Sequence, residues 1–333
     1  MNPLLIRRET TMRFIRIAFA VAGFAVLMLE PLTAQNRTTP LRIIYPFAGG
    51  GSGDVLTRLV ADRLSVVLER PVIVEPRAGA AGRLGVHAVK TSEPDGNTLL
   101  ATPIAPMAVY QSVYPALDYD PVKDFAPVSQ IATFDFGICI DPKIPASNIS
   151  ELVTWLKANP DKANFGTPGA GTLPHFFGLM FAKAAGVPLQ HIAYKGGTVA
   201  LTDLMGGQIP IVFLSTNELA ELHKSGRIRV LATSGVQRST FLPDVPTFRE
   251  IGYEIEGGGW WGFFAPAGTP AATVSKLSGA IARIVQEDDV KARIAQIGLR
   301  PTGTSPEEFA RIQREDIERW AVPIKASGFR PEQ

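Results

Sequence analysis

The chain has 333 residues, more than one compact core usually holds, which predicts two lobes. Hydrophobic residues make up 46% of it and charged residues 19%, a composition that excludes a disordered chain and is typical of a packed globular protein. The formal net charge is +2, and the Lys and Arg residues are scattered. Nucleic acids and anionic membranes bind clustered positive charge, so this pattern argues against both as partners.

The first 34 residues have the three parts of a secretory signal peptide. Residues 12–16 are basic, residues 17–29 are almost wholly apolar, and small residues precede Ala34, after which we expect cleavage. The apolar run of 13 residues is shorter than the roughly 20 that a membrane-spanning helix needs, so an anchor is the weaker interpretation. Met12 is an alternative start. Residues 1–34 contain four arginines and two glutamates, so the exported, periplasmic chain is formally neutral.

Cys139 is the only cysteine, which excludes an internal disulfide and a thiolate metal cluster. A lipoprotein is also excluded, because no cysteine stands at the cleavage site. Isoleucines flank Cys139 on both sides, which predicts a buried strand residue and not a reactive thiol.

The exported chain opens with a strand, a glycine loop and a helix. Residues 41–45 form a short β-rich run, residues 46–53 are rich in glycine, and Asp54 precedes a helical pattern of apolar residues as its expected N-cap. Residues 72–74 and 98–101 predict further strands. This alternation predicts an α/β fold with largely parallel sheets.

The same layout occurs again in the middle of the chain. Residues 163–166 predict a strand, residues 167–172 form a second glycine loop, and a helix opens at Pro174 and ends at Gly186.

The C-terminal third predicts helices that act as scaffold. One begins after Thr269-Pro270, and another begins with the capping box Ser305 to Glu308. Residues 141–143 and 257–259 are candidate hinges where the chain could cross between lobes.

A glycine loop that leads into a helix start presents backbone N–H groups and about half a positive charge to one point. With one such loop in each half, at residues 46–53 and 167–172, a closing cleft could hold a ligand that carries carboxylates. Ser52, Thr167 and Thr172 could add hydroxyl donors. The alternative is that the glycines only make tight turns.

Three further motifs have two interpretations each. His175 could contact a ligand or cap the second loop, and we favour the structural role. Residues 260–264, Trp-Trp-Gly-Phe-Phe, could line a cleft or pack as strand core, and we favour the core. Lys195 is either a solvated loop charge or a counter-charge for the ligand.

Rival chemistries lack their motifs. Neither glycine loop ends in Gly-Lys-Ser/Thr or completes G-x-G-x-x-G, so we expect no nucleotide cofactor. Ser52 stands between two glycines but outside a G-x-S-x-G pattern, which disfavours a hydrolase. The four histidines have no metal-ligand spacing, so we expect no metal.

Eight tracts in order resemble the Bug-type substrate-binding proteins of tripartite tricarboxylate transporters. The tracts are Pro46-Phe47 with Gly50-Gly51 and Asp54; Val74-Glu75 with Arg77 and Gly79-Ala80; Pro94-Asp95-Gly96 with Thr98-Leu99-Leu100; Asp124-Phe125-Ala126-Pro127-Val128; Gly169-Ala170-Gly171-Thr172 with His175; Tyr194-Lys195-Gly196-Gly197; Asp244-Val245-Pro246-Thr247; and Trp261-Gly262-Phe263-Phe264-Ala265-Pro266.

The resemblance implies a Venus-flytrap fold of the type II periplasmic binding protein class, with two lobes that each have a mainly parallel sheet flanked by helices. We expect lobe 1 to comprise residues 35–140 and 257–333, and lobe 2 to comprise residues 141–256, with the ligand cleft between them. The implied protein is a monomer without catalytic activity that captures a small carboxylate for a tripartite transporter. A ligand sensor for a signalling partner and, less favoured, an exported hydrolase are the alternatives.

The resemblance also implies a ligand-binding set from the loops that follow strands, to which we add Asp54 and His175. The carried-over residues are Phe47, Ala48, Gly49, Gly50, Gly51 and Ser52; Thr102, Pro103 and Ile104; Thr167, Gly169, Ala170, Gly171 and Thr172; Tyr194, Lys195, Gly196 and Gly197; and Ser215 and Thr216.

The sequence departs from the family at three positions. Gly53 stands where the family often has a hydroxyl residue, and Pro76 stands where the family usually has Asn. Residues 213–216, Phe-Leu-Ser-Thr, lack the acid that commonly follows the Phe. Loss of that acid would remove a partner for a ligand amine, so we expect a plain carboxylate (a di- or tricarboxylate or an aromatic acid) and not an amino acid.

Overall fold

The computed structural model describes residues 39–330, and the region from Pro40 onward forms one compact unit. The signal peptide and its cleavage site lie outside the described residues and stay predictions. Among residues 39–330, no helix is both long and apolar enough to span a bilayer.

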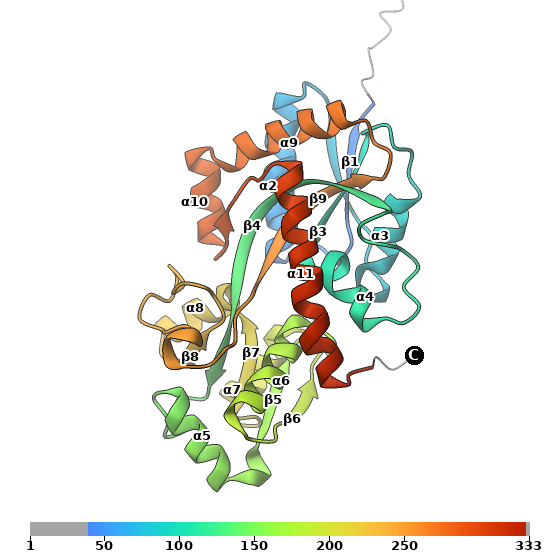
Figure 1. Cartoon of the computed structure of the whole chain (residues 1–333). Coiled ribbons are helices and arrows are strands. Elements are labelled where there is room, and N and C mark those ends of the chain that lie inside the picture. Colours follow the sequence, from blue (N-terminus) through green and yellow to red (C-terminus); the bar gives the residue numbers. More distant parts are fainter. Residues whose placement is uncertain (1–38, 331–333) are drawn as a thin grey trace, which may run out of the picture. The chain divides into compact units, whose positions relative to one another are not determined.

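A single mixed β-sheet runs through the molecule, in the strand order β2-β1-β3-β9-β4-β7-β5-β6, with β10 and β8 also paired to β4. Figure 1 shows the strands with the helices packed around them. The strands are β1 (Leu41–Tyr45), β2 (Val72–Pro76), β3 (Thr98–Pro103), β4 (Phe125–Ile140), β5 (Asn164–Thr167), β6 (Gln190–Ala193), β7 (Ile211–Ser215), β8 (Arg229–Thr233), β9 (Gly258–Pro266) and β10 (Arg300–Pro301).

Helices fill most of the connections between strands. The α-helices are α2 (Ser52–Val67), α3 (Arg83–Lys90), α4 (Tyr110–Val113), α5 (Ile149–Ala158), α6 (Leu173–Ala185), α7 (Gly197–Met205), α8 (Thr216–Lys224), α9 (Ala271–Val285), α10 (Asp288–Gln296) and α11 (Pro306–Ser327). Short 3-10 turns lie at η1 (Ala80–Gly82), η3 (Pro160–Lys162) and η4 (Arg249–Ile251), and η2 (Ala105–Val109) is a π-helical turn.

The strands at the two ends of the sheet are parallel, as expected. β1 pairs in parallel with β2 and β3, and β5 does so with β6 and β7. The expectation of mainly parallel sheets is wrong for the middle, where β4 and β9 pair antiparallel with each other and with their other neighbours. The reason is that β9 runs against the group of β1, β2 and β3, while β4 runs against the group of β5, β6 and β7.

β4 belongs to both groups of strands. Its residues 125–135 pair with β9, and its residues 136–140 pair with β7 and β8. The pairing partner of β4 therefore changes after Asp135, and the hinge expected at residues 141–143 stays a prediction. Strand β9 begins at Gly258, which pairs with Asp135. The sequence does not indicate this change of partner, because residues 134–140 continue the same strand without a turn signal.

The individual elements agree well with the sequence patterns. The strands expected at residues 41–45, 72–74 and 98–101 form, and α6 has Pro174 in its first turn and a left-handed Gly186 as its C-cap. Cys139 is fully buried, and this burial raises the pKa of its thiol well above the usual value. The prediction of a buried, unreactive thiol is confirmed.

The N-cap expected at Asp54 is wrong. Helix α2 begins at Ser52, and its N-cap is Gly51 with an extended backbone. Asp54 stands in the first turn, where its carboxylate accepts a hydrogen bond from the Gly50 N–H at 2.9 Å and pairs with Arg58 Nε at 3.0 Å. Because glycine adopts the extended N-cap conformation easily, the helix starts before the acid.

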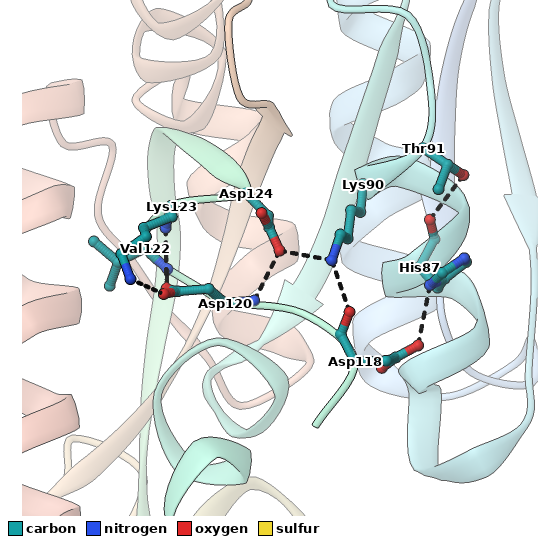
Figure 2. Close-up of polar contacts among 8 residues, drawn as sticks. All are labelled: His87, Lys90, Thr91, Asp118, Asp120, Val122, Lys123 and Asp124. Atoms are coloured by element: carbon teal, nitrogen blue, oxygen red, sulfur yellow. Dashed lines mark hydrogen bonds and ion pairs between the residues drawn. The ribbon is translucent and has the colours of Figure 1, made fainter. Parts of the chain in front are cut away.

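Asp124, which opens one of the family tracts, has a structural role. Figure 2 shows its carboxylate accepting from the Asp120 N–H at 2.8 Å and pairing with Lys90 Nζ at 2.9 Å. Lys90 also donates to the Asp118 carbonyl at 2.7 Å. The Asp120 carboxylate in turn accepts from the Val122 N–H at 3.0 Å. This network ties α3 to the turn that leads into β4.

The C-terminal helix packs against both groups of strands. α11 contacts β4, η2 and α6, and it buries Trp320 and Phe309. Trp260 is 2% exposed, packs edge-on against Phe309, and donates from its indole Nε1 to Asp316 Oδ2 at 2.9 Å. The strand-core interpretation is therefore confirmed for Trp260.

Candidate ligand-binding cavity

A cavity of about 250 Å³ is lined by β4, by Trp261 of β9 and by the segments that follow β1, β3, β5 and β7. This volume is just below the usual range for small-molecule sites, which suits a small ligand. Its walls are Ser52, Pro103, Ile104, Ala105, Tyr110, Phe134, Phe136, Pro168, Thr172, Leu173, Pro174, Leu214, Ser215, Asn217, Glu218, Trp261 and Leu299.

Helix starts converge on this cavity. Ser52 is the first residue of α2, Leu173 is the first residue of α6, and Glu218 stands in the first turn of α8. The first N–H groups of a helix have no partner within it and carry a partial positive charge, so they favour an anion. The sequence predicted the starts of α2 and α6. It missed α8, although the spacing from Ser215 to Glu218 after a buried strand is a helix-start signal.

The first glycine loop contributes one residue to the cavity wall, Ser52. Gly53 is required for a steric reason, since a Cβ there would lie 2.0 Å from the indole ring of Trp261. The Trp261 ring therefore lies against the backbone at Gly53. The Asp54 carboxylate is turned toward Gly50 and Arg58 and is not part of the wall.

The second glycine loop is held by its own side chains. Thr167 and Thr172 donate from their hydroxyls to the Gly169 carbonyl, at 3.0 and 2.7 Å. His175 Nδ1 accepts from the Gly171 N–H at 3.1 Å, so the favoured structural role of His175 agrees with its contacts. Of these residues only Thr172 lines the cavity.

His175 stacks on His191, with ring centroids 3.8 Å apart. Burial, with a contribution from His191, lowers the pKa of His175 to about 4. Burial likewise lowers the pKa of His191 to about 4, and its Nε2 lies 2.7 Å from the Thr167 hydroxyl. Both rings are therefore neutral at pH 7 and support the loop.

The expected binding set divides into wall residues and supporting residues. Five members line the cavity: Ser52, Pro103, Ile104, Thr172 and Ser215. The other members are not part of the wall: Phe47, Ala48, Gly49, Gly50, Gly51, Asp54, Thr102, Thr167, Gly169, Ala170, Gly171, His175, Tyr194, Lys195, Gly196, Gly197 and Thr216.

The tract from Tyr194 to Gly197 supports the site from outside. The Tyr194 hydroxyl donates to Asp203 at 2.9 Å, away from the cavity. The Gly196 N–H donates to the Pro168 carbonyl at 3.0 Å, which fixes the second loop. Lys195 is exposed and does not line the cavity, so its placement favours the solvated interpretation.

Aromatic rings form much of the wall, and the sequence predicted only one of them as a candidate. Phe134 and Phe136 lie on β4 with ring centroids 5.4 Å apart, and Trp261 stacks on Tyr45 at 5.9 Å. Successive residues of a strand face opposite sides, so Trp260 is core while Trp261 lines the cavity. The signal that could have found Phe134 and Phe136 is their position where β4 changes partners, which requires the sheet pairing.

An acidic residue does line the cavity. Glu218 accepts a hydrogen bond from the Ser215 hydroxyl, and its side chain is open to the cavity solvent. The surrounding protein atoms reduce its solvation, which raises the pKa of its carboxyl. An acid therefore lines the cavity one helical turn after the end of β7, and the expectation of a plain carboxylate stays a prediction.

The cavity offers little to hydrolysis or metal binding. No histidine lines it beside Ser52, and no group of three His, Cys, Asp or Glu residues within residues 39–330 could hold a metal ion. Larger hollows lie elsewhere: about 460 Å³ around Asp135 and Arg300, about 630 Å³ between α6 and α11, about 430 Å³ beside Asn97 and α9, and about 720 Å³ near Gly186. None of these four contains a residue of the expected binding set, so the convergence of helix starts identifies the smaller cavity as the candidate site.

Comparisons with known proteins agree with this geometry. Residues 56–329 match the family described as the tripartite tricarboxylate transporter family receptor. Protein BugT of Bordetella pertussis is 32% identical over 317 residues, which cover 94% of this chain and 96% of the relative.

Two similar solved structures contain carboxylates. MatC of Rhodopseudomonas palustris with bound malate has a TM-score of 0.74 and 28% identity, over 86% of this chain and 98% of its own. Another R. palustris protein, with adipate, has a TM-score of 0.79 and 28% identity, over 88% of this chain and 99% of its own. The chain therefore belongs to the tripartite tricarboxylate transporter receptor family, whose members are periplasmic solute-binding proteins of the two-lobed type II fold and not enzymes.

Proposed function

We propose that this protein captures a small carboxylate in the 250 Å³ cavity and presents it to a tripartite transporter. The observation that carries the proposal is the convergence of the α2 and α6 starts on one cavity, because their first N–H groups can bind a carboxylate without a cationic side chain. Malate and adipate in two relatives support the class of ligand.

The proposed capture uses two lobes that close on the ligand. The pairing of β4 favours a boundary between Asp135 and Phe136 on the outward path and near Gly257 on the return path. This moves the first boundary a few residues before the expected residue 140. Phe134 and Phe136 line the cavity on either side of this boundary, so a small rotation there would change the cavity directly.

The proposal includes export and a membrane partner. Residues 1–34 act as a cleaved signal peptide, and the mature protein works in the periplasm as a monomer. The ligand-bound closed form is the one that the transporter recognises, because only a contact that differs between the two forms can report that the ligand is bound.

A thermal-shift screen tests capture. The panel contains mono-, di- and tricarboxylates, aromatic acids and amino acids, and a ligand that binds only the folded protein must raise the unfolding midpoint. We expect at least one carboxylate to raise it. A panel without any carboxylate hit would contradict the proposal.

Removal of one backbone N–H group tests where the carboxylate from the screen binds. Ser52→Pro deletes the N–H at the first position of α2, where proline is tolerated and the extended Gly51 is compatible with it. We expect affinity to fall about tenfold or more, since a hydrogen bond to a charged group is lost. Ser52→Ala keeps the N–H, and Ala271→Pro makes the matched change at the start of α9, away from the cavity. Equal effects of Ser52→Pro and Ala271→Pro would contradict the assigned site.

A further inference from the structure

The helix starts around the cavity differ in charge. α6 has no acid in its first turn. α2 has Asp54, but the carboxylate of that residue is engaged by Gly50 and Arg58 behind the wall. Only α8 presents an acid, Glu218, to the cavity itself. A ligand carboxylate is therefore favoured at the α2 and α6 starts and disfavoured at the α8 start.

The wall contains no cation that could compensate a second negative charge. Its polar members are Ser52, Thr172, Ser215, Asn217 and Glu218, together with the Tyr110 hydroxyl, which donates to the Ala81 carbonyl at 2.9 Å. The remaining wall is aliphatic, proline or aromatic. A second carboxylate would have to lie against this apolar surface or near Glu218, and both positions cost free energy.

One oxygen of the Glu218 carboxylate can accept a hydrogen bond from a ligand. The Ser215 hydroxyl donates to Oε2. Oε1 lies over Gly197, where a Cβ would come within 2.7 Å of it, so the missing side chain leaves this oxygen room. A hydroxyl or ammonium group on the ligand would supply a donor, and it would also favour the ionised carboxylate, which burial disfavours by raising the pKa of Glu218.

We propose that Glu218 makes this site selective for monocarboxylates that carry an apolar or aromatic body and a hydrogen-bond donor, and that it disfavours di- and tricarboxylates. This inference rests on the proposed function and narrows it. The ligand lies with its carboxylate at the α2 and α6 starts, its body against Phe134, Phe136 and Trp261, and its hydroxyl or ammonium at Glu218.

Isothermal titration with ligands of one skeleton tests the inference. Phenylacetate has no donor, mandelate and 4-hydroxyphenylacetate add a hydroxyl at two positions, phenylglycine adds an ammonium, and phenylsuccinate adds a second carboxylate. For the wild-type protein we expect at least one donor-bearing acid to bind about tenfold or more tightly than phenylacetate. We expect phenylsuccinate to bind most weakly.

Three variants separate charge from hydrogen bonding. Glu218→Gln removes the charge but keeps an acceptor, so it should abolish a preference for ammonium and should strengthen phenylsuccinate binding about tenfold relative to phenylacetate. Glu218→Leu removes the acceptor as well and should abolish a preference for hydroxyl. Glu221→Gln is the matched control, because Glu221 stands on the same helix and pairs with Lys224 in solvent.

Two results would overturn the inference while leaving the proposed function intact. One is phenylsuccinate binding the wild-type protein more tightly than every monocarboxylate. The other is a Glu218→Gln variant in which the ratios of ligand affinities are the same as in Glu221→Gln. Absence of binding by every carboxylate in every variant would instead contradict the proposed function, and the inference with it. The ratios of ligand affinities are measured within one folded variant, so a change in the stability of that variant alone does not change them.

Discussion

The starts of α6 and α8 both open on the cavity, but they are built differently. At α6 the loop residues Thr167, Thr172 and His175 turn their polar atoms inward to hold the loop, and the first turn contains no acid. At α8 Ser215 donates to Glu218, which places an acidic side chain in the cavity wall. A helix start therefore favours an anion most where the chain has not already placed its own acid there.

The largest expected effect comes from breaking the α6 loop at Gly171. This glycine has φ +73°, and a Cβ would lie 2.9 Å from the Phe329 ring. Gly171→Val should lower the free energy of unfolding by about 4 kcal/mol, because backbone strain and overpacking add. Urea unfolding measures this loss.

Gly186→Val is the matched control for Gly171→Val. Gly186 also has a positive φ, +63°, but no atom lies within 4 Å of its Cβ position. The free energy of unfolding of this variant should fall by only about 1 kcal/mol, because backbone strain is the one cost. Equal losses in both variants would contradict the role given to the Phe329 contact.

A second expected effect is a loss of stability in acid that comes from the α6 loop. The pKa values of His175 and His191 are lowered to about 4 by burial, while the unfolded chain binds these protons near pH 6.5. The free energy of unfolding should therefore fall as the pH falls from about 6.5 toward 4, by roughly 2 to 4 kcal/mol in all. Glu218 and Asp316, whose carboxyl pKa values are raised, act in the opposite direction.

His191→Gln isolates the histidine contribution to this pH dependence. Glutamine can keep a hydrogen bond to the Thr167 hydroxyl, and it removes one of the two protonation sites. The decrease in the free energy of unfolding between pH 7 and pH 4.5, measured by urea titration, should be roughly halved. An unchanged decrease would show that the His pair does not cause it.

A smaller effect is expected from loosening the loop without breaking it. Thr172→Ala removes the hydrogen bond to the Gly169 carbonyl and should weaken ligand binding about three- to tenfold, in line with one hydrogen bond. Thr202→Ala removes a hydroxyl-to-carbonyl bond of similar length on α7, and Thr202 does not line the cavity. Titration calorimetry should show lost affinity only for Thr172→Ala. A loss for Thr202→Ala as well would mean that general destabilisation causes both.

The smallest effect is expected at Lys195. This side chain is exposed and lies outside the wall, so Lys195→Gln should change ligand affinity less than about twofold. A tenfold loss in the same titration would restore Lys195 as a counter-charge for the ligand.

Local patterns predicted the elements and part of the site. The strand, glycine loop and helix layout indicated Ser52 and Thr172 as loop residues next to helix starts, although it put the α2 N-cap at Asp54 in place of Gly51. Phe134 and Trp261 could be assigned to the cavity only from the pairing of β4 with β9, since a residue's face depends on register with a distant strand. Glu218 was missed because the expected acid was sought at the end of β7 and not in the following turn.

We expect a carboxylate to bind where the α2 and α6 starts converge, away from Glu218. A crystal structure with the tightest-binding acid from the calorimetric panel tests it most directly. We expect carboxylate oxygens within hydrogen-bonding distance of first-turn N–H groups of α2 or α6, and a ligand donor or apolar group facing Glu218. A carboxylate bound against Glu218, or in the hollow between α6 and α11, would contradict the account.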